Sequence, residues 1–352
     1  MSSTRCAART HAERWIEGLS AWPDEFGLDR MRVLLAKLGE PQRAYPSIHV
    51  VGTNGKGTAT RTIEELLAAE GLTVGAYYSP HVRSWSERIR VAGAEADFDR
   101  AVARVRPHAE GATQFEVLTA AALAEFAAAG VDVAVVEAGL GGRHDATNVV
   151  DAGVVLLTNV ALDHTDVLGD THEAIAREKL AVVKPGAVVV LGEPEWEPLV
   201  RGHEVVRGGA REAAEAFLGR PVEHEVAVSL PGRLEWRGPD ELWDGAHNPS
   251  GVAWLLDHVP PRDWVVVSSI LADKDVDAML AGLARAGRTL VATRSSSPRA
   301  LGEKELALRA EPYFERVEAD PDPHDAVRRA RALGPVLVAG SLYLLADLSR
   351  AD

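Results

Sequence analysis

The chain has 352 residues, which is enough for two domains of ordinary size and too long for a small disulfide-stapled scaffold. Hydrophobic residues make up 46% and charged residues 26% of it, as in globular proteins, so disorder of the whole chain is excluded. With 52 acidic against 38 basic residues, the formal charge of −14 argues against a protein that wraps nucleic acid through a general basic surface.

Nothing in the sequence points to secretion or to a membrane. The single cysteine, Cys6, cannot form an internal disulfide. No stretch approaches about 20 consecutive apolar residues, and residues 1–14 lack the apolar core of a signal peptide. We therefore expect a cytoplasmic protein with no membrane or nucleic-acid partner.

Short β-branched runs alternate with longer amphipathic runs, which predicts an α/β fold of βα units around a mostly parallel sheet. The predicted strands are Ile48–Gly52, Thr73–Tyr78, Val131–Glu137, Val154–Thr158, Ala187–Leu191, Trp264–Ser269, Thr289–Thr293 and Pro335–Ala339. The predicted helices are Leu28–Leu38, Thr58–Ala69, Glu116–Ala129, His172–Val182, Val276–Ala286, Glu303–Ala310 and His324–Ala332. The pattern is weakest over Gly192–Arg237, and we place a boundary at Pro231, between domains 1–230 and 231–352.

The sharpest motif is the glycine loop Gly52–Thr58, which follows a predicted strand and precedes a predicted helix. Glycines let backbone N–H groups converge on phosphate oxygens at the positive end of a helix. Lys56 would supply a positive charge to the phosphates, and Thr58 a hydroxyl to Mg²⁺. Gly57 separates Lys56 from Thr58, which departs from the common G-x-x-x-x-G-K-[ST] spacing, so a plain glycine-rich turn is the alternative.

Further polar residues follow other predicted strands, and parallel strands bring their carboxyl ends to one edge of a sheet. Ser79 could reach a metal, Glu137 stands where a Walker-B type acid would hold Mg²⁺, and His164 is a candidate ligand of a second metal. Taken singly, each has a structural alternative: a loop residue, a solvated turn or a structural histidine. Their convergence with Thr58 favours a site for Mg²⁺ and a nucleotide.

In the second predicted domain, Asp244 and His247 lie at what we expect to be an exposed turn after a strand-like segment. Asp244 could bind the ribose hydroxyls of a nucleotide. An ordinary hairpin turn at Asp244–Gly245 is the alternative.

These segments, in this order from about Phe26 to Leu348, resemble the folylpolyglutamate synthase/dihydrofolate synthase family of Mur-type ATP-dependent ligases. The matching motifs are Phe26–Arg30, Gly52–Thr58, Ser79–His81, Glu87–Ile89, Phe115–Glu116, Glu137–Asn148, Asp163–His164, Ile175–Lys179, Pro231–Arg233, Asp244–Pro249, Asp273–Asp275, Ser297–Arg299 and Gly340–Ser341. The resemblance implies a P-loop, Mur-ligase-like ATPase domain over 1–230, which carries the Mg²⁺ and folate sites. It also implies a smaller, Rossmann-like glutamate-ligase domain over 231–352, with ATP and substrate in the cleft between the two.

In this family, ATP phosphorylates a carboxylate of dihydropteroate or folate, and the amine of L-glutamate then attacks the acyl phosphate. Carried over by position, the residues implied to bind ATP are Asn54, Gly55, Lys56, Gly57, Thr58, Arg233, Asp244 and His247. Those implied to bind metal are Thr58, Ser79, Glu137, His164 and Lys179, the last as a carbamate. Those implied to line the pterin side are Gly27, Leu28, Phe115, His144, Asp145 and Ala146, with Phe115 stacking on the ring. Lys56, Lys179 and His164 are the implied catalytic residues.

Lysine is scarce in this chain, which gives the implied carbamate a chemical basis. Only six of the 38 basic residues are lysines, and arginine cannot form a carbamate because its guanidinium stays protonated. Lys56 and Lys179 therefore lie at positions where the implied chemistry calls for an amine. The alternative is that Lys179 is an ordinary surface lysine beside Glu178.

The chain also departs from the family. Two regions, Gly93–Thr113 and Gly192–Ser229, are short, and no asparagine occurs between Asn159 and Asn248, where the family has one that contacts adenine. Our leading hypothesis is a monomeric ligase that uses ATP and Mg²⁺ to add L-glutamate to dihydropteroate, to folate or to both. A Mur-type ligase with another acceptor and a degenerate ATP-binding member of the family are the alternatives.

Overall fold

The structure, a computed structural model, describes residues 9–350, so Cys6 lies outside the described residues. The chain divides into two compact units, one ending at Val228 and the other beginning at Ser229. The second unit thus begins two residues before Pro231, where the sequence pattern places the boundary. Each unit is built around its own sheet.

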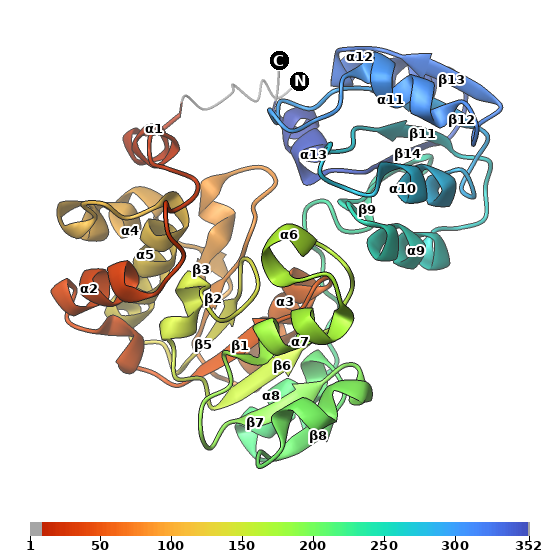
Figure 1. Ribbon diagram of the computed structural model, residues 1–352. Coiled ribbons are helices and arrows are strands. Elements are labelled where there is room, and N and C mark those ends of the chain that lie inside the picture. The colour runs from red at the N-terminus through yellow and green to blue at the C-terminus, as the bar shows by residue number, and fades with distance from the viewer. Residues whose placement is uncertain (1–8, 351–352) are drawn as a thin grey trace. The chain divides into compact units, whose positions relative to one another are not determined.

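Within residues 9–228, eight strands form one sheet in the order β4-β3-β2-β5-β1-β6-β7-β8 (Figure 1). They are β1 (Ser47–Val51), β2 (Val74–Tyr77), β3 (Ile89–Val91), β4 (Ala94–Glu95), β5 (Val133–Glu137), β6 (Val154–Leu157), β7 (Val188–Leu191) and β8 (Val205–Arg207). Neighbours between β2 and β8 pair in parallel, whereas β3 and β4 are antiparallel at one edge. The predicted α/β fold with a mostly parallel sheet is confirmed.

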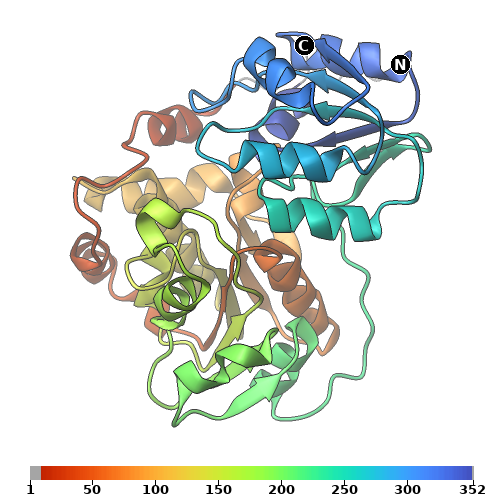
Figure 2. The same cartoon turned by 45° about the vertical axis from the view of Figure 1, so that its right-hand side comes forward.

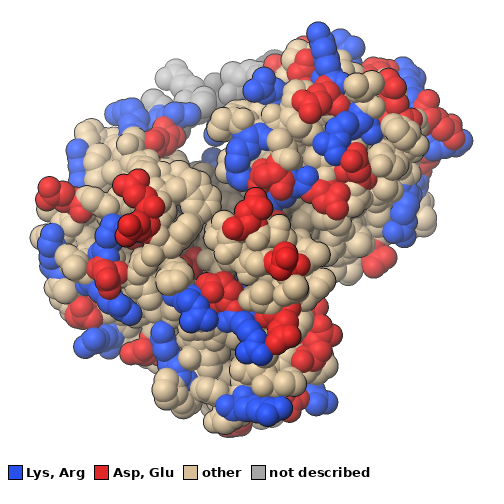
Figure 3. Space-filling model, in the orientation of Figure 1, with Lys and Arg blue, Asp and Glu red and all other residues tan. Residues whose placement is uncertain are grey.

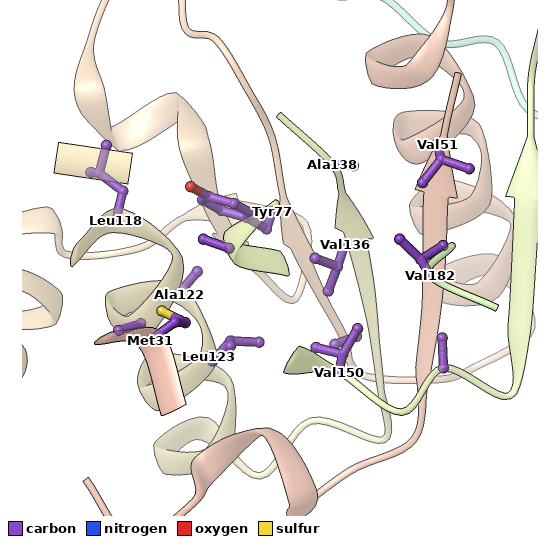
Figure 4. Packing of buried hydrophobic residues seen from close by; sticks show 14 of the residues in the cluster. Met31, Val51, Tyr77, Leu118, Ala122, Leu123, Val136, Ala138, Val150 and Val182 are labelled. Atoms are coloured by element: carbon purple, nitrogen blue, oxygen red, sulfur yellow. The ribbon is translucent and has the colours of Figure 1, made fainter. Parts of the chain in front are cut away.

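Helices cover both faces of this sheet, because its central strands are apolar on both sides. The helices are α1 (His11–Glu17), α2 (Asp29–Lys37), α3 (Lys56–Ala69), α4 (Phe98–Val105), α5 (Gln114–Ala129), α6 (Thr165–Leu168), α7 (His172–Leu180) and α8 (Ala210–Leu218). On β5, Val133 and Val135 pack with α3 and α8, while Ala134 and Val136 pack with α2, α5 and α7. Figure 4 shows part of the second cluster, where Val136 and Tyr77 face residues of α2 and α5.

Helix α3 begins earlier than predicted, at Lys56 instead of Thr58. Gly55 precedes it with φ of 78°, a left-handed conformation that glycine adopts without steric cost. The glycine turns the chain from the loop straight into the helix. The first N–H groups of α3, which lack partners within the helix, therefore lie directly after the glycine loop.

Within residues 229–350, six strands form a second sheet in the order β13-β12-β11-β14-β10-β9, with only β9 antiparallel. They are β9 (Glu235–Gly238), β10 (Glu241–Trp243), β11 (Val265–Ser268), β12 (Thr289–Ala292), β13 (Arg316–Ala319) and β14 (Val336–Ala339). The helices are α9 (Pro249–His258), α10 (Val276–Leu283), α11 (Glu303–Ala310), α12 (Pro323–Arg331) and α13 (Leu342–Ser349). The smaller α/β domain is also confirmed.

The chain between α8 and the second unit is held against the first unit, although residues 221–229 form no helix or strand (Figure 2). Glu70, directly after α3, accepts hydrogen bonds from the His224 ring at 2.9 Å and the Glu223 N–H at 2.8 Å. It also pairs with Arg220 at 2.7 Å. The end of α3 therefore fixes this connecting segment.

Within the described chain, no helix is both long enough and apolar enough to cross a lipid bilayer. On the face shown in Figure 3, lysine and arginine side chains are interspersed with aspartate and glutamate side chains.

Replacing Gly75 by alanine should destabilise the first unit. A Cβ atom at Gly75 would lie 2.6 Å from the ring of Phe126 on α5, so strand and helix would have to separate. We expect a loss of about 1–3 kcal/mol in the free energy of unfolding, measured by chemical denaturation. Gly153→Ala is the matched control, because a Cβ there meets nothing within 4 Å. Equal stabilities of the two variants would contradict this packing.

Candidate active site

Four neighbouring parallel strands, β2, β5, β1 and β6, end at one edge of the first sheet. Ser79 follows β2, Glu137 ends β5, the glycine loop follows β1, and Thr158 follows β6. The carboxyl edge of such a sheet is where α/β proteins bind ligands. The chain therefore gathers its candidate phosphate and metal residues from segments far apart in the sequence.

The glycine loop is fixed by the segment after β6. The Asn54 N–H donates to the Asn159 side-chain oxygen at 2.9 Å, and the Asn159 amide donates to the Asn54 carbonyl at 3.2 Å. The Thr158 hydroxyl donates to the same carbonyl at 2.7 Å. Gly52 must lack a side chain, because a Cβ there would lie 1.9 Å from the Thr158 hydroxyl oxygen. The role of Asn159 was not predicted, because its only signal in the sequence is its position just after a strand.

Two lysine side chains meet at one carbonyl oxygen of this loop. Lys56 Nζ donates to the Gly52 carbonyl at 3.1 Å, and Lys179 Nζ donates to the same oxygen at 2.8 Å. Lys179 is buried, so it is not the surface lysine of the alternative interpretation. Burial, and after it the charge of Lys56, lower the pKa of Lys179 to about 7, while the carboxylate of Asp163 opposes the shift. Lys179 is therefore a partly neutral amine near pH 7.

Ser79 and Glu137 offer oxygen atoms of the kind that a hard cation prefers. The Ser79 N–H donates to a Glu137 carboxylate oxygen at 3.0 Å, and that carboxylate is buried, not solvated. The Ser79 hydroxyl is also buried and has no hydrogen-bond partner among the described residues. An unpaired buried hydroxyl beside a buried carboxylate fits Mg²⁺, which prefers oxygen ligands.

The remaining predicted metal ligands include His164 and Thr58, which differ in position. His164 precedes α6 with φ of 51°, its side chain is 31% exposed, and its N–H donates to Asp163 at 2.9 Å. Thr58 lies in the first turn of α3. Among residues 9–350, no three His, Cys, Asp or Glu side chains are grouped as a metal site of those residues alone would require. The predicted set is of another kind, since it contains two hydroxyls and a lysine.

A second glycine-rich segment, residues 139–142 after β5, supports helix α7, which carries Lys179. A Cβ at Gly142 would lie 2.5 Å from the Lys179 carbonyl and 2.6 Å from that of Glu178, so the two backbones touch. The Arg143 N–H donates to the Glu178 carbonyl at 3.1 Å. This contact was not predicted, because glycines after a strand equally indicate that a ligand lies nearby.

The predicted acceptor residues lie on three segments of the first unit. Phe115, in the first turn of α5, packs so closely on Gly139 that a Cβ there would lie 2.5 Å from the ring. Asp145 and Ala146 are buried beside this loop, whereas His144 is exposed. Both predicted residues before α2 are half-buried, namely Gly27 and Leu28.

In the second unit, the prediction of an exposed Asp244 is wrong. Asp244 is buried, and its two carboxylate oxygens accept hydrogen bonds from the Ala246 N–H at 2.8 Å and the Leu234 N–H at 2.9 Å. Burial raises the pKa of its carboxyl, and the charge of Arg233 opposes that shift. His247 is half-buried, and its ring lies 2.9 Å from the Gly245 carbonyl. Asp244 therefore shapes the turn that carries His247.

Comparison with known proteins assigns both units. Residues 50–204 match the Mur ligase middle domain, and residues 232–342 match the Mur ligase, glutamate ligase domain. The dihydrofolate synthase/folylpolyglutamate synthase of Mycobacterium tuberculosis is 33% identical to this chain, and the match covers 89% of this chain and 84% of that protein.

The chain belongs to the dihydrofolate synthase/folylpolyglutamate synthase family. It is therefore a ligase with the Mur-ligase architecture, as the resemblance of its motifs implies.

Solved structures of this family agree in fold over nearly the whole chain. The folylpolyglutamate synthase of Mycobacterium tuberculosis complexed with ADP is 31% identical, with a TM-score of 0.87, and the match covers 97% of this chain and 98% of that one. A bifunctional folylpolyglutamate synthase/dihydrofolate synthase with Mn, AMPPNP and L-glutamate bound is 30% identical, with a TM-score of 0.83 and 95% of both chains covered. The M. tuberculosis sequence match runs over 409 residues, more than the 352 of this ligase, so that relative carries segments absent here.

Replacing Asn159 by leucine should weaken nucleotide binding, because the glycine loop would lose both hydrogen bonds to that side chain. We expect the dissociation constant of ADP, measured by calorimetry, to rise roughly tenfold. Asn159→Gln keeps the side-chain amide but displaces it, so its dissociation constant for ADP should lie between those of wild type and Asn159→Leu. Unchanged ADP affinity in Asn159→Leu would show that the loop does not depend on this residue.

Proposed function

We propose that this protein uses ATP and Mg²⁺ to join L-glutamate to dihydropteroate, to folyl-glutamates or to both. The observation that carries the proposal is the meeting of Lys56 and Lys179 at the Gly52 carbonyl, inside a glycine loop beside Ser79 and Glu137. Similarity over most of the chain to a dihydrofolate synthase/folylpolyglutamate synthase and to a folylpolyglutamate synthase supports a pteroate or folate as the acceptor.

The reaction consists of two transfers. A carboxylate oxygen of the acceptor attacks the γ-phosphorus of ATP, and ADP leaves. The amine of glutamate then attacks the carbonyl carbon of the acyl phosphate, phosphate leaves, and the nitrogen loses a proton. Backbone N–H groups at the start of α3 and the charge of Lys56 would stabilise the phosphates in the first transfer.

We assign a first Mg²⁺ to Thr58, Ser79 and Glu137, and a second metal ion to His164 together with a carbamate on Lys179. Bound there, Mg²⁺ would neutralise charge on the transferring phosphoryl group. A carbamate forms when a neutral amine attacks CO₂, and burial of Lys179 supports this because it favours the neutral amine. The relative with Mn and AMPPNP bound supports a divalent metal in this reaction.

We assign the acceptor to the first unit, near Phe115, and we assign the glutamate-ligase role to the domain 231–352. The acceptor residues are Gly27, Leu28, Phe115, His144, Asp145 and Ala146. The ATP-binding residues are Asn54, Gly55, Lys56, Gly57, Thr58, Arg233 and His247, and Asp244 holds the turn that carries His247. The match of residues 232–342 to a glutamate ligase domain supports the second assignment. A cytoplasmic location and a monomeric state remain predictions from the sequence.

The purified protein should release ADP over many turnovers only when Mg²⁺, glutamate and a pteridine acceptor are all present. Dihydropteroate and tetrahydrofolate are offered separately, and mass spectrometry of the products shows which of them gains glutamate. Lys56→Ala should lower the rate at least roughly a hundredfold, because it removes a charge aimed at the phosphates. If neither dihydropteroate nor tetrahydrofolate supported ADP release, the proposal would be contradicted. Turnover with other acceptors would then favour another Mur-type ligase, and ATP binding without turnover would favour a degenerate member of the family.

Activity should fall as the pH drops below about 7, because protonation of Lys179 removes the amine that CO₂ must react with. About one pH unit above its pKa the amine is roughly nine-tenths neutral, so the rate should level off there. The checks are rates from about pH 6 to about pH 8.5 and carbon-13 NMR of the carbamate in labelled bicarbonate. Lys179→Arg should lose the signal and the activity, and Lys304→Arg, at an exposed lysine, should keep both. A carbamate signal that persists in Lys179→Arg would refute the assignment.

A further inference from the structure

A buried chain of hydrogen bonds joins β1 to the loop after β5. His49 on β1 lies with its ring Nε2 2.8 Å from the Thr147 hydroxyl, and that hydroxyl donates to Asp145 at 2.5 Å. The other Asp145 carboxylate oxygen accepts from the Gly139 N–H at 3.0 Å and the Leu140 N–H at 2.7 Å. All three side chains are buried.

The partners determine where each proton lies. Burial raises the pKa of Asp145, but three backbone N–H groups donate to its carboxylate and favour the ionised form. We therefore take Asp145 as the acceptor of the single hydroxyl proton of Thr147. The Thr147 oxygen can then only accept from His49, whose Nε2 must carry the hydrogen. Burial, and after it the charge of Lys184, lower the pKa of His49 to about 3, which keeps the ring neutral. Its Nδ1 is therefore unprotonated, and it has no partner among the described residues.

Packing alone does not favour histidine at this position. Val51, the next β1 residue on the same face, packs in the apolar cluster with α5 and α7, and an aliphatic side chain at 49 would leave no unpaired nitrogen. What His49 adds is the donor that orients the Thr147 hydroxyl. Through Asp145, that orientation reaches the Gly139 backbone, on which the Phe115 ring packs.

We propose that His49 is a positioning residue for the acceptor: its Nε2–H orients Thr147 so that Asp145 holds the Gly139–Leu140 amides beneath Phe115. His49 contacts no reacting atom. The proposal rests on the proposed function, since it takes Phe115 as the platform for the aromatic ring of the acceptor. The proposed role of His49 is in the binding of the acceptor. The phosphate loop is fixed by Asn159 and Thr158 instead.

The test compares His49→Leu with His49→Gln, whose side-chain amide can donate from about the place of the histidine Nε2. We expect His49→Leu to raise the dissociation constant of dihydropteroate, measured by calorimetry with ADP present, and its KM in the reaction, both roughly tenfold. ADP affinity should stay within about twofold of wild type. His49→Gln should recover most of the acceptor affinity, although an effect on folding alone would lower the stability of both variants.

A double-mutant cycle adds a second criterion. Thr147→Val should resemble His49→Leu, and the double variant should be no weaker than either, because all three break the same chain. Equal losses in His49→Leu and His49→Gln, additive losses in the cycle, or a parallel loss of ADP affinity would each overturn the proposal. Wild-type protein that binds dihydropteroate without forming product would overturn the proposed function alone, and wild-type protein that binds none would overturn both.

Discussion

Two side-chain nitrogens at one carbonyl oxygen are the constraint on which this active site depends. If both were ammonium ions, Lys56 and Lys179 would repel each other across the Gly52 carbonyl. Burial of Lys179 relieves the repulsion, because it favours the neutral amine. The same burial removes Lys179 from bulk solvent, so its neighbours determine what it can react with. The glycine loop and the helix carrying Lys179 therefore function as one unit.

Close approaches at three glycines hold these parts together. Gly52 lies against Thr158, Gly142 against the backbone of Lys179, and Gly139 against Phe115, each too closely for a Cβ atom. Such contacts leave little freedom, since even a methyl group would push a strand from its neighbour. A site assembled in this way has its geometry set by the sheet, which accounts for the agreement in fold with relatives about 30% identical.

The central strands and most long helices could be predicted from the sequence, but the edges and the contacts could not. Strands such as β5 read as continuous apolar runs because both of their faces are buried. Strands such as β9 and β13 are short and polar, and nothing in their pattern separates them from loops. The resemblance to the family implied that an amine is needed at position 179. The burial of Lys179 and the chain from His49 to Asp145, however, depend on residues about a hundred positions apart. The burial of Asp244 was missed because an Asp-Gly turn is usually exposed.

The contact between Glu70 and the segment after α8 has a consequence for the order of folding. Glu70 and Glu223 are 153 positions apart, so the first unit closes its last contacts only when the chain has been synthesised past α8. The second unit begins only a few residues later. Since domains generally fold as units and the N-terminal one folds first during synthesis, the phosphate loop is complete before most of the second sheet leaves the ribosome. We therefore expect a nascent chain of this ligase to carry a folded phosphate loop before residues of the second unit, such as Arg233 and His247, can join it in binding ATP.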